Sequence, residues 1–379
     1  MPRDLDGITL IDLAGLGPSA RCVRALADLG ARWIRLRPPA AANRLSSEWH
    51  SYGAFRGAEQ FEFDLKHPGA RALYLRLARM ADIIVEGFRP GIADRLGIGY
   101  RDVSAVNQGI VYCAATGYGQ TGPLSREVGH DINYQALGGG LALNGRGAEG
   151  LPAIPGMTLA DSAGGGWHAA LRVLAALVER SRTGRGKFLD VSAAEGVLQL
   201  MSLAVDQELA TGQPAANYVT CGKYACYGIY MTADGKFLAV GAIETKFFAN
   251  LCRVLGLEHL VDRQFQFDAQ EELRRAIAEV FRTRARDEWI ETFSGIEACL
   301  APVLAINELA HHPQWQARGV FVEYTHPRAG RLCQVGPMGG GKDRGAASDV
   351  SDGACHQVLR SIGADDAEID ALIASGVVR

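Results

Sequence analysis

The sequence predicts an α/β fold with a large Rossmann-like domain, and three observations carry this prediction. Short apolar strands alternate with amphipathic helices over residues 8–191, a pattern typical of βαβ units and a parallel sheet. Turns that contain glycine follow several of these strands. Finally, 48% of the 379 residues are hydrophobic and 21% are charged, which provides enough apolar side chains for a large core.

The elements of the large domain follow in order along the chain. Strands are expected at 8–13, 33–36, 82–86, 109–114 and 188–191, and helices at about 19–29, around Leu73–Met80, and at 167–179.

A smaller α+β domain is expected after the break at 211–214. A hairpin at 228–240, with a turn at 233–235, precedes helical patterns at about 245–255 and 270–282. We therefore place the large domain at 1–191, a linker at 192–227, the small domain at 228–306 and a second linker at 307–334.

Charge and cysteine content narrow the class of protein. The net charge is -3 and no dense Lys/Arg stripe occurs, so a small molecule is a better partner than nucleic acid. The polar first residues and the absence of a membrane-length apolar run favour a cytoplasmic protein without membrane contact. Eight scattered cysteines predict reduced thiols and no structural metal.

Three cationic positions indicate a phosphate-bearing ligand. The run 15–20 fits a loose dinucleotide-binding turn, but Arg37 and its neighbour Arg35 stand where an NAD site needs an acidic residue. Lys66 and Arg89 add two further cations at the same expected sheet edge, which suits a nucleotide such as coenzyme A. The alternative is a tight turn with solvated surface charges.

His130 and Asp161 are the candidates for proton transfer. An imidazole and a carboxylate both move protons near neutral pH, and each lies beside glycine, which lets a ligand approach the backbone. Asp161 is equally well explained as a helix N-cap, with the N–H groups of Gly164–Gly166 free to bind an oxyanion. Glu244 closes an apolar strand, from which it can hold an imidazole in one tautomer.

Several of these motifs together resemble the family III CoA-transferase superfamily of the CaiB/BaiF type. They are the runs at 64–66, 86–91, 117–123, 129–134 and 233–235. The histidine-bearing run and residues 240–244 look most like the α-methylacyl-CoA racemase branch. The resemblance extends through nearly the whole chain, including residues 363–378.

The resemblance implies a racemase that inverts the α-carbon of a 2-methylacyl-CoA thioester through an enolate. It places His130 and Asp161 on opposite faces of that carbon, with no cofactor beyond coenzyme A as the substrate carrier. It also implies that Glu244 and Tyr227 support the histidine. The residues implied to line the CoA site are Arg37, Lys66, Arg89 and Tyr134.

The family fold further implies an interlocked homodimer in which residues 335–379 return to the large domain. Active sites then lie between subunits, so that Glu244 acts on the histidine of a partner chain.

The sequence also fits two functions other than a racemase. In the related CoA-transferases the same aspartate is a nucleophile, and His130 favours the racemase. Met157 and Ser162 depart from the racemase pattern near Asp161, which puts turnover of ordinary branched acyl-CoA in question. The third hypothesis is a CoA-binding protein without catalysis, or an NADP-dependent reductase built on the 15–20 turn.

Overall fold

The computed structural model describes residues 3–39, 55–145, 150–215, 218–326, 330–338 and 353–379. These residues group into two compact units. Unit 1 comprises Met1–Gly140, Pro155–Met201 and Pro313–Arg379, and unit 2 comprises Leu141–Ile154 and Ser202–His312.

Unit 1 is built on a six-stranded sheet in which every neighbouring pair is parallel, with the order β3-β2-β1-β4-β5-β6. The predicted mixed α/β fold with a parallel sheet is confirmed. The strands are β1 (Thr9–Asp12), β2 (Arg32–Arg37), β3 (Glu59–Glu62), β4 (Ile83–Glu86), β5 (Val111–Thr116) and β6 (Lys187–Ser192).

The sequence pattern does not predict β3, because three of its four residues are polar. It lies at the sheet edge, where such side chains are tolerated.

The strand order reverses between β1 and β4, which are neighbours in the sheet. From β1 the chain proceeds outward to β2 and β3, and from β4 it proceeds the other way to β5 and β6. At such a reversal the loops that leave the carboxyl ends of the two central strands diverge, which opens a crevice for ligands. The fold therefore directs attention to the loops after β1 and β4.

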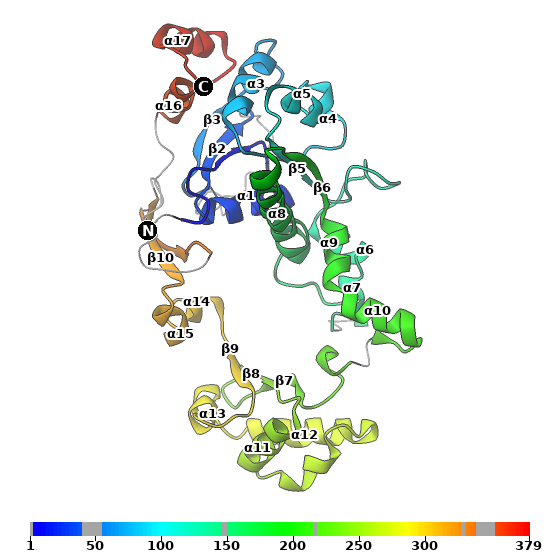
Figure 1. The fold of residues 1–379 in the computed structure, drawn as a ribbon. Coiled ribbons are helices and arrows are strands. Elements are labelled where there is room, and N and C mark those ends of the chain that lie inside the picture. Colours follow the sequence, from blue (N-terminus) through cyan, green and yellow to red (C-terminus); the bar gives the residue numbers. More distant parts are fainter. Residues whose placement is uncertain (1–2, 40–54, 146–149, 216–217, 327–329, 339–352) are drawn as a thin grey trace. The chain divides into compact units, whose positions relative to one another are not determined.

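Helices cover both faces of this sheet (Figure 1). On one face, α1 (Pro18–Asp28) and α8 (His168–Thr183) bury Leu26 and Val173 against the strands. On the other face, α3 (Ala70–Met80) and α5 (Tyr100–Val106) bury Leu77 and Val103. The remaining helices of unit 1 are α4 (Ile92–Arg95), α6 (Asp131–Leu137), the π-helix η2 (Ala160–Trp167), α9 (Ala193–Leu200), α15 (Pro313–Ala317), α16 (Ala354–Ser361) and α17 (Asp366–Ser375), with α7 (Gly140–Leu143) at its boundary.

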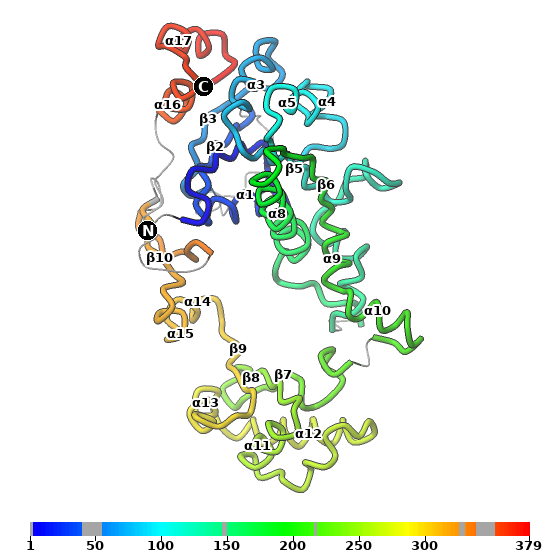
Figure 2. The backbone as a smooth tube through the Cα atoms, in the orientation of Figure 1, coloured from blue at the N-terminus to red at the C-terminus, as the bar shows by residue number. Residues whose placement is uncertain are grey.

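The C-terminal segment completes unit 1. Helices α16 and α17 contribute Val358 and Ile369 to the core on the α3 face. Beyond them, the backbone of Arg379 exchanges two hydrogen bonds with Glu62, with N···O distances of 2.9 and 3.0 Å. In Figure 2 this C-terminal segment, drawn in red, lies beside the β3 and α3 part of the chain. The hairpin of β10 (Phe321–His326) and β11 (Gly330–Val335) also belongs to unit 1.

Unit 2 has a three-stranded antiparallel sheet in the order β7-β8-β9. Its core gathers large apolar side chains, among them Phe248, Phe281 and Trp289. The strands are β7 (Tyr227–Met231), β8 (Phe237–Gly241) and β9 (Leu300–Val303). The helices are α10 (Ser202–Thr211), α11 (Thr245–Leu255), α12 (Gln270–Phe281), α13 (Arg286–Thr292) and α14 (Ile306–Leu309), with 3-10 turns at η4 (Val219–Cys221), η5 (Glu258–Arg263) and η6 (Phe267–Ala269).

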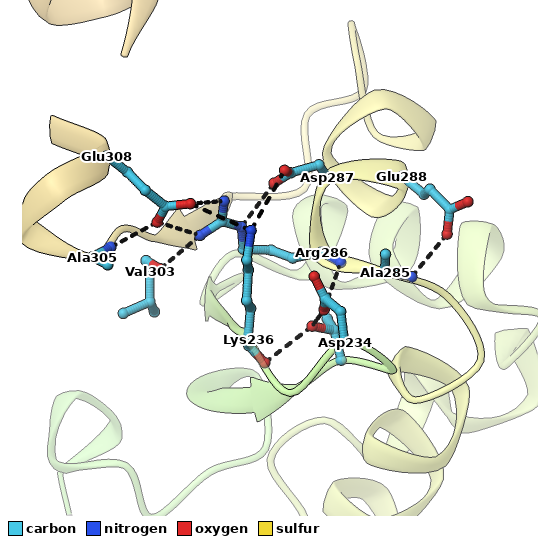
Figure 3. A network of polar contacts seen from close by, with 10 residues as sticks. Asp234, Lys236, Ala285, Arg286, Asp287, Glu288, Val303, Ala305 and Glu308 are labelled. Carbon is cyan, nitrogen blue, oxygen red and sulfur yellow. Dashed lines mark hydrogen bonds and ion pairs between the residues drawn. The ribbon is translucent and has the colours of Figure 1, made fainter. Parts of the chain in front are cut away.

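Arg286 ties three elements of unit 2 together (Figure 3). Its guanidinium donates to both carboxylate oxygens of Glu308, at 2.7 and 2.9 Å, and to Asp287 at 2.8 Å. Its backbone N–H donates to Asp234 in the β7–β8 turn at 3.1 Å. The hydrogen bonds from Arg286 hold the pKa of Glu308 well below its usual range. The network therefore fixes the β7–β8 turn, α13 and α14 relative to one another.

Two further features bear on the class of protein. No helix within the described residues is long and apolar enough to cross a membrane. All eight cysteines lie in the described residues and are free thiols.

Candidate active site

A cavity of about 830 Å³ opens at the carboxyl ends of β1, β4 and β5. The loops that follow these strands line it with Gly17, Gly87 and Gly117, and residues of the 125–134 segment line it as well. All of the lining residues belong to unit 1. The cavity therefore lies where a sheet with a reversed strand order is expected to bind its ligand.

His130 and Asp161 both line this cavity. His130 is the exposed N-cap residue of α6, and its backbone N–H donates to Asn133 Oδ1 at 3.0 Å. Asp161 lies in the first turn of η2, and a Cβ placed on Gly17 would lie 3.7 Å from its Oδ1. The fold thus brings together two groups that are about thirty residues apart in the sequence.

The alternative role of Asp161 as a helix N-cap is wrong. The N-cap residue of η2 is Leu159, two residues before Asp161, and its backbone angles are already helical. Within the described residues, no side chain makes a cap hydrogen bond to the start of η2. A π-helical segment widens the turn, and such segments are frequent at functional sites. Asp161 is therefore carried on the helix itself.

The three glycines after Asp161 serve packing, so their expected role as an open oxyanion site is wrong. Gly164, Gly165 and Gly166 are buried inside η2 and are not part of the cavity wall. A Cβ on Gly165 would lie 2.5 Å from Pro18, and one on Gly166 would lie 2.3 Å from Arg21. The missing side chains let α1 pack directly on the helix that carries the aspartate.

Asp131 connects the two candidate groups. It directly follows His130, and its Oδ1 accepts a hydrogen bond from the backbone N–H of Asp161 at 2.8 Å. Its Oδ2 accepts from the Gln135 amide at 2.5 Å. One carboxylate therefore anchors the start of η2 to α6. Sequence reasoning did not identify Asp131, because its position next to His130 is the only signal for it in the sequence.

The cavity raises the pKa of Asp161 to about 6. Burial is the main cause, because it disfavours the charged carboxylate, and the negative charge of Asp131 adds to it. The positive charges of Arg21 and His130 act in the opposite direction. A carboxyl group with this pKa exchanges its proton near neutral pH, which suits a general acid or base.

The predicted CoA-site residues do not all reach the cavity. Arg89 and Tyr134 line it, whereas Arg37 and Lys66 do not. Arg37 Nε is buried and has no hydrogen-bond partner among the described residues, and the side chain of Lys66 is exposed. Tyr134 donates to the Gly129 carbonyl at 2.5 Å, which holds its ring against the wall.

Tyr227 and Glu244 belong to unit 2. Tyr227 begins β7, and Glu244 is the N-cap residue of α11. Their support of His130 stays a prediction.

Two arginines on α1, Arg21 and Arg24, also line the cavity and were missed by sequence reasoning. The Gly-rich turn before α1 drew attention to backbone groups rather than to these side chains.

No group of three His, Cys, Asp or Glu side chains suited to a metal ion occurs in the part of the chain that the structure describes.

Comparison with known proteins agrees with this architecture. The sequence model of one protein family, described as CoA-transferase family III, matches residues 5–341 of this chain. This chain belongs to CoA-transferase family III. It is 37% identical over 321 residues to the α-methylacyl-CoA racemase of Homo sapiens, an alignment that covers 84% of this chain and 82% of the relative. The resemblance drawn from the sequence motifs is therefore confirmed.

The family also contains CoA-transferases. The succinyl-CoA:glutarate CoA-transferase of Homo sapiens is 27% identical over 351 residues, which cover 88% of this chain and 80% of that protein. Among solved structures, a CAIB/BAIF family protein from Brucella suis superposes with a TM-score of 0.80 at 21% identity. That match covers 96% of this chain and all of the other, and it shows the shared fold.

Proposed function

We propose that this enzyme of family III is an acyl-CoA racemase or epimerase that inverts the α-carbon of a 2-methylacyl-CoA thioester. The observation that carries the proposal is that His130 and Asp161 line one cavity. Two proton-transfer groups in one site suit a reaction that removes a proton from one face of a carbon and returns one to the other.

The reaction follows from the protonation states of the two groups. Neutral His130 takes the α-proton, the electrons move into the thioester carbonyl to form an enolate, and protonated Asp161 delivers a proton to the opposite face. The reverse direction uses the carboxylate of Asp161 as base and the imidazolium as acid. A pKa near 6 supports both roles for Asp161, because the acid and base forms are then accessible close to neutral pH.

The rest of the proposed site follows the family resemblance. Arg89 and Tyr134 hold coenzyme A at the cavity, and Arg37 and Lys66 bind it outside the cavity. Glu244 and Tyr227 support the imidazole. The enzyme works as an interlocked homodimer and needs no cofactor beyond the coenzyme A of its substrate.

The test is the interconversion of (2R)- and (2S)-2-methylacyl-CoA in deuterium oxide. The enzyme should incorporate one deuterium at C2 as it interconverts the isomers, and His130→Ala should abolish the interconversion. His259→Ala, which removes an exposed histidine from unit 2, serves as the matched control. Absence of exchange across a broad panel of acyl-CoA thioesters would reject the proposal.

A CoA-transferase is the second candidate, supported by the cavity position of Asp161 and by the transferase relatives. In that reaction the carboxylate attacks the thioester, releases CoA as thiolate and becomes a mixed anhydride. Hydroxylamine would trap this anhydride at Asp161, and CoA would pass to a free carboxylic acid. His130→Ala would leave that transfer active, which separates the two candidates.

A further inference from the structure

Arg21 places an unpaired positive charge in the cavity wall. Its side chain is exposed and lines the cavity, and it takes part in no hydrogen bond or ion pair within the described residues. Arg24, one turn further along α1, provides a contrast, because it is ion-paired with Asp28 and donates to the Arg56 carbonyl at 2.8 Å. The two arginines share a helix, and Arg21 alone of this pair is left free to bind an anion.

Helix stability does not account for Arg21. The residue lies near the N-terminus of α1, where the helix dipole is positive and a cation is unfavourable. No acidic residue stands in the first turn of α1 to offset the charge. A ligand anion would gain from both the guanidinium and the positive helix end.

The position of Arg21 relates it to the acyl group. Arg21 packs on η2, the helix that carries Asp161, because a Cβ on Gly166 would lie 2.3 Å from the Arg21 Cβ, and both side chains line the same cavity. The positive charge of Arg21 also lowers the pKa of Asp161. The phosphates of coenzyme A are separated from the thioester by the whole pantetheine arm. A cation in the cavity wall that also carries the group that protonates C2 is therefore placed for the acyl substituents rather than for the phosphates.

The surroundings of Asp161 on η2 are polar as well. Thr158, which lines the cavity, and Ser162 place their hydroxyl oxygens 3.2 Å apart, three residues before and one residue after the aspartate. The Thr158 hydroxyl, which Ser162 supports from behind the cavity wall, offers a hydrogen bond to a charged or hydrated acyl chain. This is also where the sequence departs from the racemase pattern.

We infer that Arg21 binds a carboxylate on the acyl group, so that the substrate is the CoA thioester of a 2-methyl dicarboxylic acid. A guanidinium suits this role, because its planar donors match the two oxygens of a carboxylate. The inference rests on the proposed racemase function, which positions C2 between His130 and Asp161.

The test compares two thioesters that differ only in charge at the chain end. They are 2-methylglutaryl-CoA, with the thioester next to the methyl-bearing carbon, and 2-methylpentanoyl-CoA, in which a methyl group replaces the distal carboxylate. The wild-type enzyme should exchange the α-proton of the charged thioester with a kcat/KM at least about tenfold higher. Arg21→Gln should lower the ratio of kcat/KM for 2-methylglutaryl-CoA to kcat/KM for 2-methylpentanoyl-CoA about 10–100-fold, chiefly by raising KM for the charged thioester.

Two further variants sharpen the result. Arg21→Lys should restore part of the preference, because it keeps the charge without the bidentate geometry. Arg172→Gln removes an exposed cation of α8 that is outside the cavity, and it should leave the wild-type ratio.

A wild-type ratio near one would overturn the inference. An equal loss with both thioesters in Arg21→Gln would also overturn it, since Arg21 would then act on the thioester or on Asp161. If neither thioester exchanges, the racemase proposal fails, and calorimetric Kd values for the same two thioesters decide the role of Arg21. The carboxylate site then requires tighter binding of 2-methylglutaryl-CoA that Arg21→Gln removes.

Discussion

Replacing Asp161 by asparagine should stabilise the protein at alkaline pH while it abolishes activity. Folding raises the pKa of this carboxyl from 3.8 to about 6, mainly by burial. Below pH 3.8 the group is neutral in both the folded and the unfolded chain and costs nothing. As the pH rises towards 6 the unfolded chain ionises first, so the folded state carries a penalty that is complete above pH 6.

The full pKa shift corresponds to about 3 kcal/mol. The carboxyl faces an open cavity, and solvent screening reduces the expected penalty to about 1–2 kcal/mol. Asparagine has nearly the same shape and never ionises, so the Asp161→Asn variant avoids this cost. Its free energy of unfolding should exceed that of the wild type by about this amount at pH 8, and by less at pH 5.

Urea denaturation at pH 5 and pH 8 measures this difference, with isomer interconversion assayed on the same samples. Asp370→Asn, on the exposed surface of α17, serves as the control and should change neither quantity at either pH. A variant at position 161 that gains no stability at pH 8, or gains equally at both pH values, would refute the argument that burial tunes this group.

Two further predictions concern the packing around η2. Asp131→Asn keeps an acceptor for the Asp161 N–H but removes the charge, so it should lower the pKa of Asp161. In the direction of racemisation that uses the Asp161 carboxylate as base, the acidic limb of the kcat profile should therefore shift to lower pH. An unshifted profile would mean that the charge is irrelevant. In Gly196→Ala the new Cβ would lie 1.7 Å from the Gly164 carbonyl oxygen. The free energy of unfolding, measured with urea, should therefore fall by about 1–3 kcal/mol or more. In Gly156→Ala the new Cβ would meet no atom of the described residues within 4 Å, so stability should change by less than about 0.5 kcal/mol. Equal losses in the two variants would contradict the packing argument.

The sequence was informative wherever local patterns determine structure. Apolar runs located the strands of the parallel sheet other than β3, whose residues are mostly polar. His130 and Asp161 could be identified because an imidazole and a carboxylate are the side chains that transfer protons near neutral pH. Strand order in a βαβ fold then places such loops at one sheet edge, where the structure has its cavity.

What the sequence could not predict depends on contacts between distant segments. The bond between Asp131 and the Asp161 backbone spans thirty residues, and no local pattern encodes it. The sequence predicts that the glycines at 164–166 form an accessible first helical turn, and only the contact with α1 shows that they are buried. Arg21 and Arg24 are alike in sequence and differ only in the partners that the fold gives them.

The pairing of Arg379 with Glu62 has a consequence for how the protein is made. Translation delivers β1–β6 to the ribosome exit long before α16 and α17 follow, so the part of the α3-side core that packs against these two helices stays uncovered until they emerge. Residues 202–312 emerge earlier and hold a separate core, which is free to form in the meantime. Premature termination before Ala354 would thus release a chain in which this part of the core is exposed, and such a chain is a target for chaperones and proteases.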